Sequence, residues 1–366
     1  MAAPAVAGLE ASGAGRGDRQ RRSEEHEASG GWLIGDRRRV WEGACLPRRS
    51  ALRRVGTRTA GVGMKGLFLD AVDDLADVFR RVVRPDDPPM TVNEQLEVPP
   101  DTLPSLLAGY DFVFDDHSQM PTEWMRRCPG LKHIIFLGTG ARSYMHPEEL
   151  AEHGITVHII KGYGDTAVAE HTIALMWAAA RGLAVMDRGM REGQWVRTEG
   201  MELTGKTLGL LGFGGIAAEV ARIAVGSGMR VLAWNRSPKT APGVTFVDLD
   251  KLLAESHVLS VHLLLTDETR GFVSAERLGK LRAGSILVNT ARGAVVDEAA
   301  MIAALRAGRL RHAALDVFTK EPLPAGHELT TLPNVTLSAH SAFRTPEASE
   351  NLIRRALDIA KGLSGR

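Results

Sequence analysis

Short apolar runs alternate with amphipathic stretches along residues 64–366. The first series of runs predicts strands over residues 66–69, 112–114, 133–136 and 155–160, with helices over 71–82, 104–108, 122–127 and 147–153. The second series predicts strands over residues 208–212, 230–234, 258–263, 285–289 and 313–318, with helices over 216–225, 249–255, 275–281 and 298–307. Strands that alternate with helices are typical of parallel sheets built from βαβ units. The pattern therefore predicts an α/β fold with two doubly wound domains.

Residues 1–63 lack this pattern. They hold twelve Arg, no Lys and seven acids, a net charge of +5, and no apolar core of a secretory signal. The acids also argue against an Arg-rich transit peptide. We expect a disordered, solvated leader. Because a predicted strand begins directly after Met64, a further hypothesis is that Met64 is the native start and that the leader is not native.

Composition narrows the function classes. The 366 residues are 44% hydrophobic and 24% charged, which is typical of a globular protein, and the net charge of +1 gives no polycation for nucleic acid. The longest apolar stretch, 173–186, is interrupted by Arg181 and is shorter than the ~20 residues of a membrane span. Cys45 and Cys128 cannot build a disulfide framework, and Cys128 near His133 is no metal motif. We expect a cytoplasmic protein with no metal, nucleic acid or membrane partner.

A glycine-rich turn follows the strand predicted at 208–212. The spacing Gly212-x-Gly214-x-x-Ala217 joins this strand to a predicted helix. Gly212 permits the tight turn, Gly214 lets the backbone approach a pyrophosphate at the helix N-terminus, and Ala217 lets the helix pack closely on the strand. In this strand–turn–helix context, the motif predicts a dinucleotide site.

The end of the next strand bears on the choice of dinucleotide. An acid there would bind the ribose 2′-hydroxyl of NAD, but this chain has Asn235, followed by Arg236, Ser237 and Lys239. Arg236 and Lys239 carry charges suited to a 2′-phosphate. The sequence therefore favours NADP(H). The alternative is that Arg236 stacks on the adenine and that NAD(H) is also accepted.

Three chemically capable side chains follow the last predicted strands. Arg292 offers a guanidinium fork for a carboxylate and a neighbouring oxygen, and Glu321 and His340 each follow a later apolar run. Each has a plain structural alternative, namely a surface ion pair, a loop acid before proline and a buried core histidine. Their succession at sheet-edge positions behind a nucleotide motif favours a shared site.

These segments resemble one known family. Thr-Ala-Arg-Gly at 290–293, Leu-Asp-Val-Phe-Thr-Lys-Glu-Pro at 315–322 and His-Ser-Ala at 340–342 resemble the D-isomer-specific 2-hydroxyacid dehydrogenases. The resemblance implies a Rossmann nucleotide-binding domain, residues 161–338, inserted in a flavodoxin-like substrate domain, residues 64–160 plus 339–366. It also implies a homodimer and reduction of a small 2-oxo acid, of the glyoxylate or hydroxypyruvate type, to the D-2-hydroxy acid.

The resemblance also implies roles for single residues. His340 would give a proton to the substrate carbonyl, Glu321 would hold the other imidazole nitrogen, and Arg292 would orient the 2-oxo acid. Backbone N–H groups of Gly138, Thr139 and Gly140 would hold the substrate carboxylate. The residues expected at the cofactor are Gly212, Gly214, Gly215, Ile216, Asn235, Arg236, Ser237, Leu264, Thr269, Thr290, Ala291, Asp316 and Ala342.

Several alternatives stay open. The same fold serves as a dinucleotide-sensing, corepressor-like binding protein, and phosphite oxidation uses a similar Arg, Glu and His set. Relatives that oxidise formate pair the histidine with glutamine, so Glu321 argues against that activity. Arg142 departs from the common family pattern, and it either meets a second acidic group of the substrate or lies on the surface.

Overall fold

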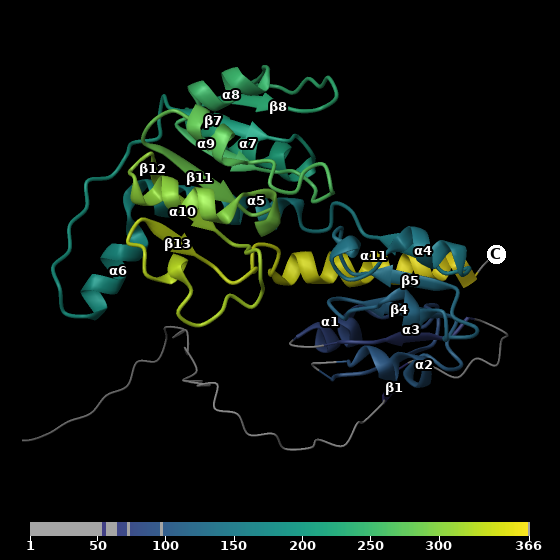
Figure 1. Cartoon of the computed structure of the whole chain (residues 1–366). Coiled ribbons are helices and arrows are strands. Elements are labelled where there is room, and N and C mark those ends of the chain that lie inside the picture. The colour runs from purple at the N-terminus through teal and green to yellow at the C-terminus, as the bar shows by residue number, and fades with distance from the viewer. Residues whose placement is uncertain (1–52, 56–63, 72–73, 96–97, 365–366) are drawn as a thin grey trace, which may run out of the picture. The chain divides into compact units, whose positions relative to one another are not determined.

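The computed structural model describes residues 53–55, 64–71, 74–95 and 98–364 (Figure 1). Most of the expected leader therefore lies outside the described residues, and so does Cys45. The exception is β1 (Arg53–Val55), whose backbone pairs antiparallel with β3 (Met90–Val92) at the edge of the first sheet. For these three residues the prediction of a leader outside the fold is wrong, because they complete a sheet edge.

The first sheet places β2 centrally and has the order β1-β3-β2-β4-β5-β6. Its remaining strands are β2 (Gly66–Phe68), β4 (Phe112–Asp115), β5 (His133–Phe136) and β6 (Thr156–Ile159). The strands β2 to β6 are all parallel. Counted from β2, their order is 2-1-3-4-5, which is the flavodoxin-like order.

The second sheet is parallel throughout, with the order β13-β12-β11-β10-β7-β8-β9. Its strands are β7 (Thr207–Leu211), β8 (Arg230–Trp234), β9 (Val244–Phe246), β10 (Val258–Val261), β11 (Ser285–Asn289), β12 (Leu310–Leu315) and β13 (Val335–Leu337). Counted from β7 this is 3-2-1-4-5-6 with a seventh strand added, the order of the Rossmann fold. The predicted fold class is confirmed.

Both sheets are covered on both faces, because side chains alternate between the faces along each strand. In β2 and β4, Phe68, Phe112 and Phe114 enter the core under α1 and α11, whereas Leu67 and Val113 enter the core under α2 to α4. The helices of this part are α1 (Leu75–Val82), α2 (Leu103–Leu106), α3 (Thr122–Met125), α4 (Pro147–Glu152) and α11 (Pro346–Ser364).

The helices of the second sheet follow the same rule. One face is covered by α5 and α7, and the other by α8, α9 and α10. These helices are α5 (Asp165–Arg181), α7 (Gly215–Gly226), α8 (Leu249–Glu255), α9 (Ala275–Lys280) and α10 (Glu298–Arg306). A further helix, α6 (Leu183–Arg191), follows α5 directly. Short 3-10 turns lie at Pro100–Thr102, Ala141–Ser143, Gly293–Val295 and Glu328–Thr330.

The chain returns to the first sheet after it completes the second. Helix α11, yellow in Figure 1, lies beside the elements of the first sheet. Its residues Leu352 and Ile353 are fully buried with Phe79 of α1. The second sheet is thus an insertion between β6 and α11 along the chain.

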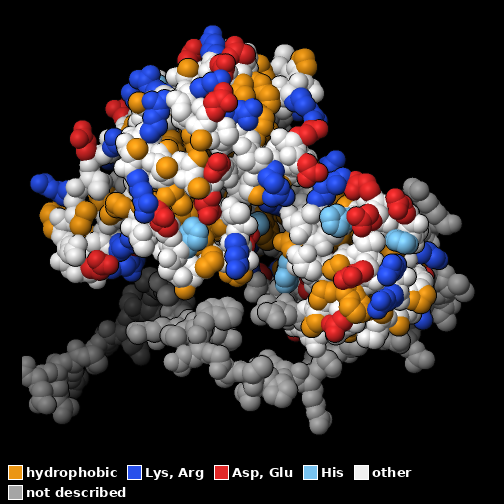
Figure 2. All heavy atoms as spheres, in the orientation of Figure 1, with side chains coloured by type: hydrophobic (Ala, Val, Ile, Leu, Met, Phe, Trp, Pro, Cys, Tyr) orange, Lys and Arg blue, Asp and Glu red, His pale blue; other side chains and the backbone are white. Residues whose placement is uncertain are grey.

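The elements that the pattern did not predict include β1, β3, β9 and α6. Strands of three residues are too short to show a period, and β3 is recognised only from its pairing with β1 and β2. Figure 2 shows Lys and Arg side chains interspersed with Asp and Glu on the visible face. Within the described ranges, no helix combines the length and apolarity needed to cross a bilayer.

Candidate active site

The three candidate catalytic residues lie after neighbouring strands. Arg292 follows β11, Glu321 follows β12 and His340 follows β13, and these three strands are adjacent in the second sheet. Because the strands are parallel, their carboxyl ends meet at one edge of the sheet. This edge, the carboxyl edge, also carries the glycine turn that follows β7.

His340 and Glu321 form a close pair. The His340 Nδ1 atom lies 2.6 Å from Glu321 Oε2, and the other carboxylate oxygen accepts the Phe318 backbone N–H at 2.8 Å. Burial by itself raises the pKa of Glu321, but the hydrogen bond and charge of His340, the Phe318 N–H and the charge of Arg292 together bring it below its usual value. Glu321 therefore stays a carboxylate that fixes the imidazole ring, which leaves Nε2 for a substrate.

Asp316 holds the backbone on which His340 sits. The buried Asp316 carboxylate accepts hydrogen bonds from Ser338 Oγ at 2.6 Å and from the backbone N–H groups of Ser341 and Ala342, both at 2.9 Å. Burial raises the pKa of Asp316, but these bonds and that of His171 bring it below the usual value. The observed role of Asp316 is to position this loop, and its contact with a cofactor stays a prediction.

The loop is strained at His340 itself. His340 has a φ of 49°, the left-handed region that residues other than glycine rarely adopt. Its backbone N–H donates to the Asp316 carbonyl oxygen at 2.7 Å. Such strain persists only where the surroundings fix the backbone, and it is common at functional sites.

Arg292 is held by its own loop. The Asn289 side chain donates to the Arg292 carbonyl oxygen at 3.0 Å and accepts the Ala291 N–H at 3.0 Å. The Arg292 guanidinium also donates to the Ala291 carbonyl oxygen at 2.7 Å. At the next position, Gly293 packs so closely that an added Cβ would lie 2.0 Å from the Phe318 carbonyl carbon. Glycine here keeps the loops of Arg292 and Glu321 together.

The predicted substrate loop follows β5 in the first sheet. Gly138 and Gly140 are buried, whereas Thr139 is exposed. A Cβ on Gly140 would lie 2.2 Å from Arg292 Nη2, so this glycine permits close approach of the loop to the guanidinium. The structure thus brings Gly140 and Arg292 together, as a carboxylate site requires. Arg142, two residues on, pairs with Glu148, and both side chains are largely exposed.

Sequence reasoning missed an acidic loop at the carboxyl ends of β2 and β4. The Asp70 carboxylate, fully buried, accepts the backbone N–H groups of Asp116, His117 and Ser118 at 2.8–2.9 Å. It also accepts the Ser118 hydroxyl at 2.8 Å. The signal was present, because Asp70 follows its strand directly and a further pair of acids ends β4.

Two tyrosines were also missed. Burial raises the pKa of Tyr163 to about 12 and also raises the pKa of Tyr144, and the charge of Arg292 acts against both shifts. Tyr163 packs edge-on against Phe343, three residues after His340, with ring centroids 6.3 Å apart. No short motif marks these tyrosines, since their relation to Arg292 depends on tertiary structure.

The glycine turn fits a dinucleotide pyrophosphate. Gly212 has a φ of 92°, and a Cβ there would lie 2.7 Å from the His262 carbonyl oxygen. Gly214 has open space where its Cβ would be, and it is the N-cap residue of α7, which has no side-chain cap. The first amides of a helix have no intrahelical acceptor and favour an anion. Gly215 packs on Asp165, partly buried Ile216 follows it, and Ala217 is fully buried.

The end of β8 is tied to this turn. Asn235 Oδ1 accepts the Phe213 N–H at 3.2 Å, and its amide donates to the Ser237 carbonyl oxygen at 2.8 Å. Lys239 Nζ donates to the Phe213 carbonyl oxygen at 2.6 Å, so it braces the glycine turn. Arg236 pairs with Glu268 at 3.1 Å between two well exposed side chains.

The other predicted cofactor residues lie around the same edge. Leu264 is 59% exposed although it is a large apolar residue, and its carbonyl oxygen accepts the Thr269 hydroxyl at 2.6 Å. Thr290 and Thr172 of α5 share a hydrogen bond of 2.8 Å. Ala291 and Ala342 lie in the loops described above. These positions agree with one site, and their contacts with a cofactor stay predictions.

Two doubly wound sheets, a glycine turn at a helix N-terminus and a His–Glu pair beside an arginine define a class of dinucleotide-binding α/β protein. The family described as "D-isomer specific 2-hydroxyacid dehydrogenase, NAD binding domain" matches residues 173–342. A glyoxylate reductase of Thermofilum pendens is 36% identical over 259 residues, which cover 67% of this chain and 76% of that protein. The chain belongs to the D-2-hydroxyacid dehydrogenase family.

Further relatives support the same family assignment. A D-3-phosphoglycerate dehydrogenase of Archaeoglobus fulgidus is 38% identical over 264 residues, which cover 69% of this chain and 50% of that protein. This chain thus spans half the length of that relative. The crystal structure of a glyoxylate reductase from Paecilomyes thermophila has a TM-score of 0.71 and 28% identity, and covers 81% of this chain and 94% of that one. The family's NAD-binding domain makes a nicotinamide dinucleotide the cofactor class.

Proposed function

We propose that this protein reduces a small 2-oxo acid, of the glyoxylate or hydroxypyruvate type, to the D-2-hydroxy acid. The observation that carries the proposal is the 2.6 Å contact between His340 and Glu321 on the edge that holds Arg292. An imidazole held by a carboxylate suits proton transfer, and a guanidinium suits a substrate carboxylate. The names of related glyoxylate and hydroxypyruvate reductases support this substrate class.

In the proposed reaction, each residue of the candidate site has a separate role. The bound nicotinamide supplies the hydride to C2 of the substrate. His340 gives the proton from Nε2 to the carbonyl oxygen, while Glu321 holds Nδ1 and fixes the orientation of the ring. Arg292 orients the substrate carboxylate and polarises the carbonyl group, and the N–H groups of residues 138–140 hold the carboxylate from the other side. In the oxidative direction, His340 takes the proton back.

The assignment of chain segments follows from these roles. Residues 161–338 form the nucleotide-binding domain in this proposal, and residues 64–160 with 339–366 form the substrate domain. The turn at Gly212, Gly214 and Gly215 would hold the pyrophosphate of the cofactor, and Asn235 at the end of β8 would lie beside its adenosine ribose.

The deciding experiment is a panel of oxidation rates at 340 nm. The panel contains glyoxylate, hydroxypyruvate, pyruvate and a phenyl-substituted 2-oxo acid, each with NADPH and with NADH. Turnover of one of the small acids, with the D-2-hydroxy acid as product, is the expected outcome. Cofactor binding without turnover of any 2-oxo acid would contradict the proposal and favour the sensing role or phosphite oxidation.

For the cofactor, we propose a preference for NADP(H), with NAD(H) also accepted. No acid stands at Asn235 to repel a 2′-phosphate, and Arg236 is largely exposed. Its exposed pair with Glu268 is worth at most ~1 kcal/mol, so a phosphate competes well for it.

Asn235→Asp should move the ratio of kcat/KM values toward NADH by about tenfold or more, because a carboxylate binds the 2′-hydroxyl and repels the 2′-phosphate. Steady-state kinetics with both cofactors measures the ratio. The matched control is Asn351→Asp, which makes the same change at an exposed asparagine in α11. An unchanged ratio in Asn235→Asp would contradict the preference.

We also propose that the protein is a homodimer in the cytoplasm. Leu183, Met190 and Trp195, in and just after α6, expose large apolar side chains, with Trp195 77% exposed. Apolar groups gathered on one segment are typical of an interface. Cys128 is buried and unpaired, which suits a reducing compartment.

A further inference from the structure

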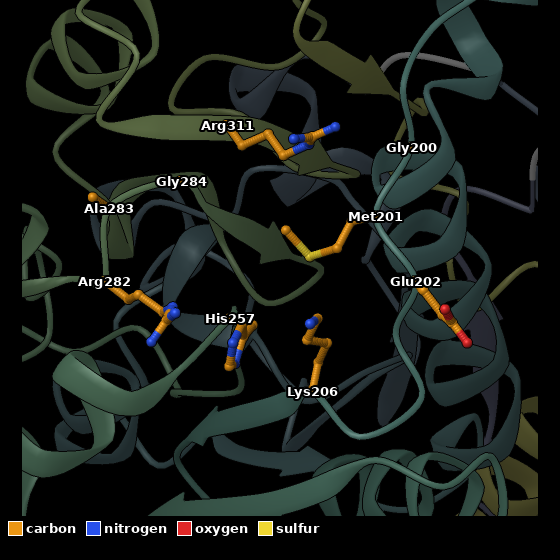
Figure 3. Close-up of a pocket in the computed structure, with 9 residues that line it drawn as sticks. All are labelled: Gly200, Met201, Glu202, Lys206, His257, Arg282, Ala283, Gly284 and Arg311. Atoms are coloured by element: carbon orange, nitrogen blue, oxygen red, sulfur yellow. The ribbon is translucent and has the colours of Figure 1, made fainter.

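A cavity of about 390 Å³ lies at the edge of the second sheet opposite to the carboxyl edge (Figure 3). Several of its lining residues stand directly before strands, with Lys206 before β7, His257 before β10 and 282–284 before β11. The amino ends of parallel strands meet there. The cavity is therefore separate from the site of Arg292, Glu321 and His340, and nothing in the proposed reaction uses it.

The cavity is cationic. Within the described residues, no hydrogen bond or ion pair joins the side chain of Lys206 or of Arg282 to another group. Figure 3 shows the Lys206 side chain directed toward the middle of the cavity and the carboxylate of Glu202 directed away from it. Two positive charges thus lack a counterion among the described residues. An anion from solution would supply it.

His257 adds a neutral donor. Its Nδ1 atom accepts the Thr207 backbone N–H at 3.2 Å, so the ring proton lies on Nε2. Burial, together with the charges of Arg282, Lys206 and Arg230, lowers the pKa of His257 and keeps the ring neutral. In Figure 3 the ring stands between Arg282 and Lys206. Lys206, Arg282 and His257 together offer hydrogen-bond donors to the oxygen atoms of an oxyanion.

A structural role explains the neighbouring arginines but not these two cations. Helix C-termini gather at the amino ends of the strands, where they attract positive charge. Arg309 serves that purpose at the end of α9, since it donates to the carbonyl oxygens of Gly279 and, at 2.6 Å, Leu281. Arg311 donates to the Glu199 carbonyl oxygen. The side chains of Lys206 and Arg282 make no such bond to a described carbonyl group.

We propose that this cavity binds a small phosphorylated compound, with the phosphate between Lys206, Arg282 and Nε2 of His257. A phosphate dianion matches the two unpaired charges, and its oxygens accept from all three side chains. Met201, whose side chain crosses the cavity in Figure 3, provides an apolar contact for the carbon skeleton. The volume is at the lower end of the range for small-molecule sites, which suits a compound of a few carbons.

Titration calorimetry tests the site in the full chain. Inorganic phosphate and glycerol 3-phosphate are titrated separately, in protein already saturated with dinucleotide so that the glycine turn after β7 is filled. We expect saturable binding of glycerol 3-phosphate that weakens as salt is added. Weaker binding of inorganic phosphate assigns part of the affinity to the carbon skeleton, and equal binding assigns it to the phosphate group alone.

Charge-neutralising variants place the binding. Lys206→Gln and Arg282→Gln should each weaken binding at least about tenfold, since each removes a charge-assisted contact. Arg126→Gln, an exposed arginine elsewhere, should leave it unchanged. Thermal unfolding confirms that all variants are folded. Absence of saturable binding up to about 20 mM, or equal affinity in all variants, would overturn the proposal.

Discussion

His340 must satisfy two structural requirements, one on its side chain and one on its backbone. Its ring must present Nε2 while Glu321 holds Nδ1, and its backbone must adopt a φ of 49°. The two are connected, because both carboxylate oxygens of Asp316 accept backbone N–H groups of this loop. The chemistry of the side chain therefore depends on a buried acid that never has to touch the substrate.

Replacing His340 by Asn separates the backbone requirement from the side-chain requirement. Asn tolerates the left-handed region but cannot donate an acidic proton. His340→Asn should therefore fold normally and lower kcat by a factor of ~10²–10⁴, with little change in the Kd of the dinucleotide. Steady-state kinetics and fluorescence titration measure both, with the exposed His153→Asn as the control. Turnover near that of the wild type would rule out His340 as the proton donor.

Asp115 is a buried acid whose titration affects the stability of the fold. It is fully buried at the end of β4, and no described group bonds its Oδ2 atom. Burial, followed by the charges of Asp70 and Asp116, holds the pKa of Asp115 well above the usual range. Between its unfolded pKa of about 4 and this higher value, the folded state binds the extra proton. Stability therefore falls as the pH rises across this window.

Asp115→Asn removes this titration. The variant should exceed the wild type in free energy of unfolding by ~1–3 kcal/mol at pH 8, and by less at pH 5, because no charge remains to be buried. Urea denaturation at both pH values measures the difference. Asp101→Asn, at an exposed acid, should show no comparable change. A gain that is the same at both pH values would contradict the titration argument.

At the scale of elements, the site depends on how closely two loops approach. The turn after β11 packs on the loop after β12 at Gly293, against the backbone of Phe318. Backbone atoms on both sides leave no flexible side chain to yield. The distance between Arg292 and Glu321 is thus set by the absence of a single methyl group.

Gly293→Ala should disturb both loops. A Cβ at 2.0 Å from the Phe318 carbonyl carbon forces the backbone apart, at a cost of ~1–3 kcal/mol in stability and with a marked fall in kcat/KM. Gly279→Ala is the matched control, because its Cβ meets nothing within 4 Å and the helix α9 gains up to ~1 kcal/mol. Thermal unfolding and kinetics compare the two. Equal effects would show that packing at Gly293 does not set the site.

At the scale of the whole molecule, the large apolar side chains of α6 and of the residues just after it lie outside the hydrophobic cores of the two sheets. Leu183 and Met190 are about half exposed and Trp195 is more exposed still. A segment of this composition gains stability only when another surface covers it. This links the exposed apolar groups to the proposed dimer.

Trp195→Ser should weaken the dimer, since burial of a large aromatic side chain contributes several kcal/mol at an interface. Sedimentation velocity at micromolar concentration should show a shift toward the monomer. Val225→Ser, at another exposed apolar residue, should leave the dimer intact. A wild-type protein that sediments as a monomer would contradict the proposal directly.

The local elements and the grouping of the candidate site residues can be predicted from the sequence. Buried parallel strands appear as apolar runs, so β2, β4, β7 and β11 were predicted close to their observed bounds. The glycine spacing 212–217 and the polar residues directly after the strands are likewise local features. Since every parallel strand ends at the same edge, position in the chain was enough to group Arg292, Glu321 and His340.

The contacts that hold these parts together depend on the tertiary structure. The edge strand β1 and the short β3 exist through pairing across 39 residues or fewer, and α11 joins the core of β2 from the far end of the chain. Asp70 and Asp316 gained their roles from N–H groups more than 20 residues away. Arg142 is engaged by Glu148, which the motif alone left open. The reason is physical: burial and hydrogen bonding depend on which segments meet, and no local pattern records that.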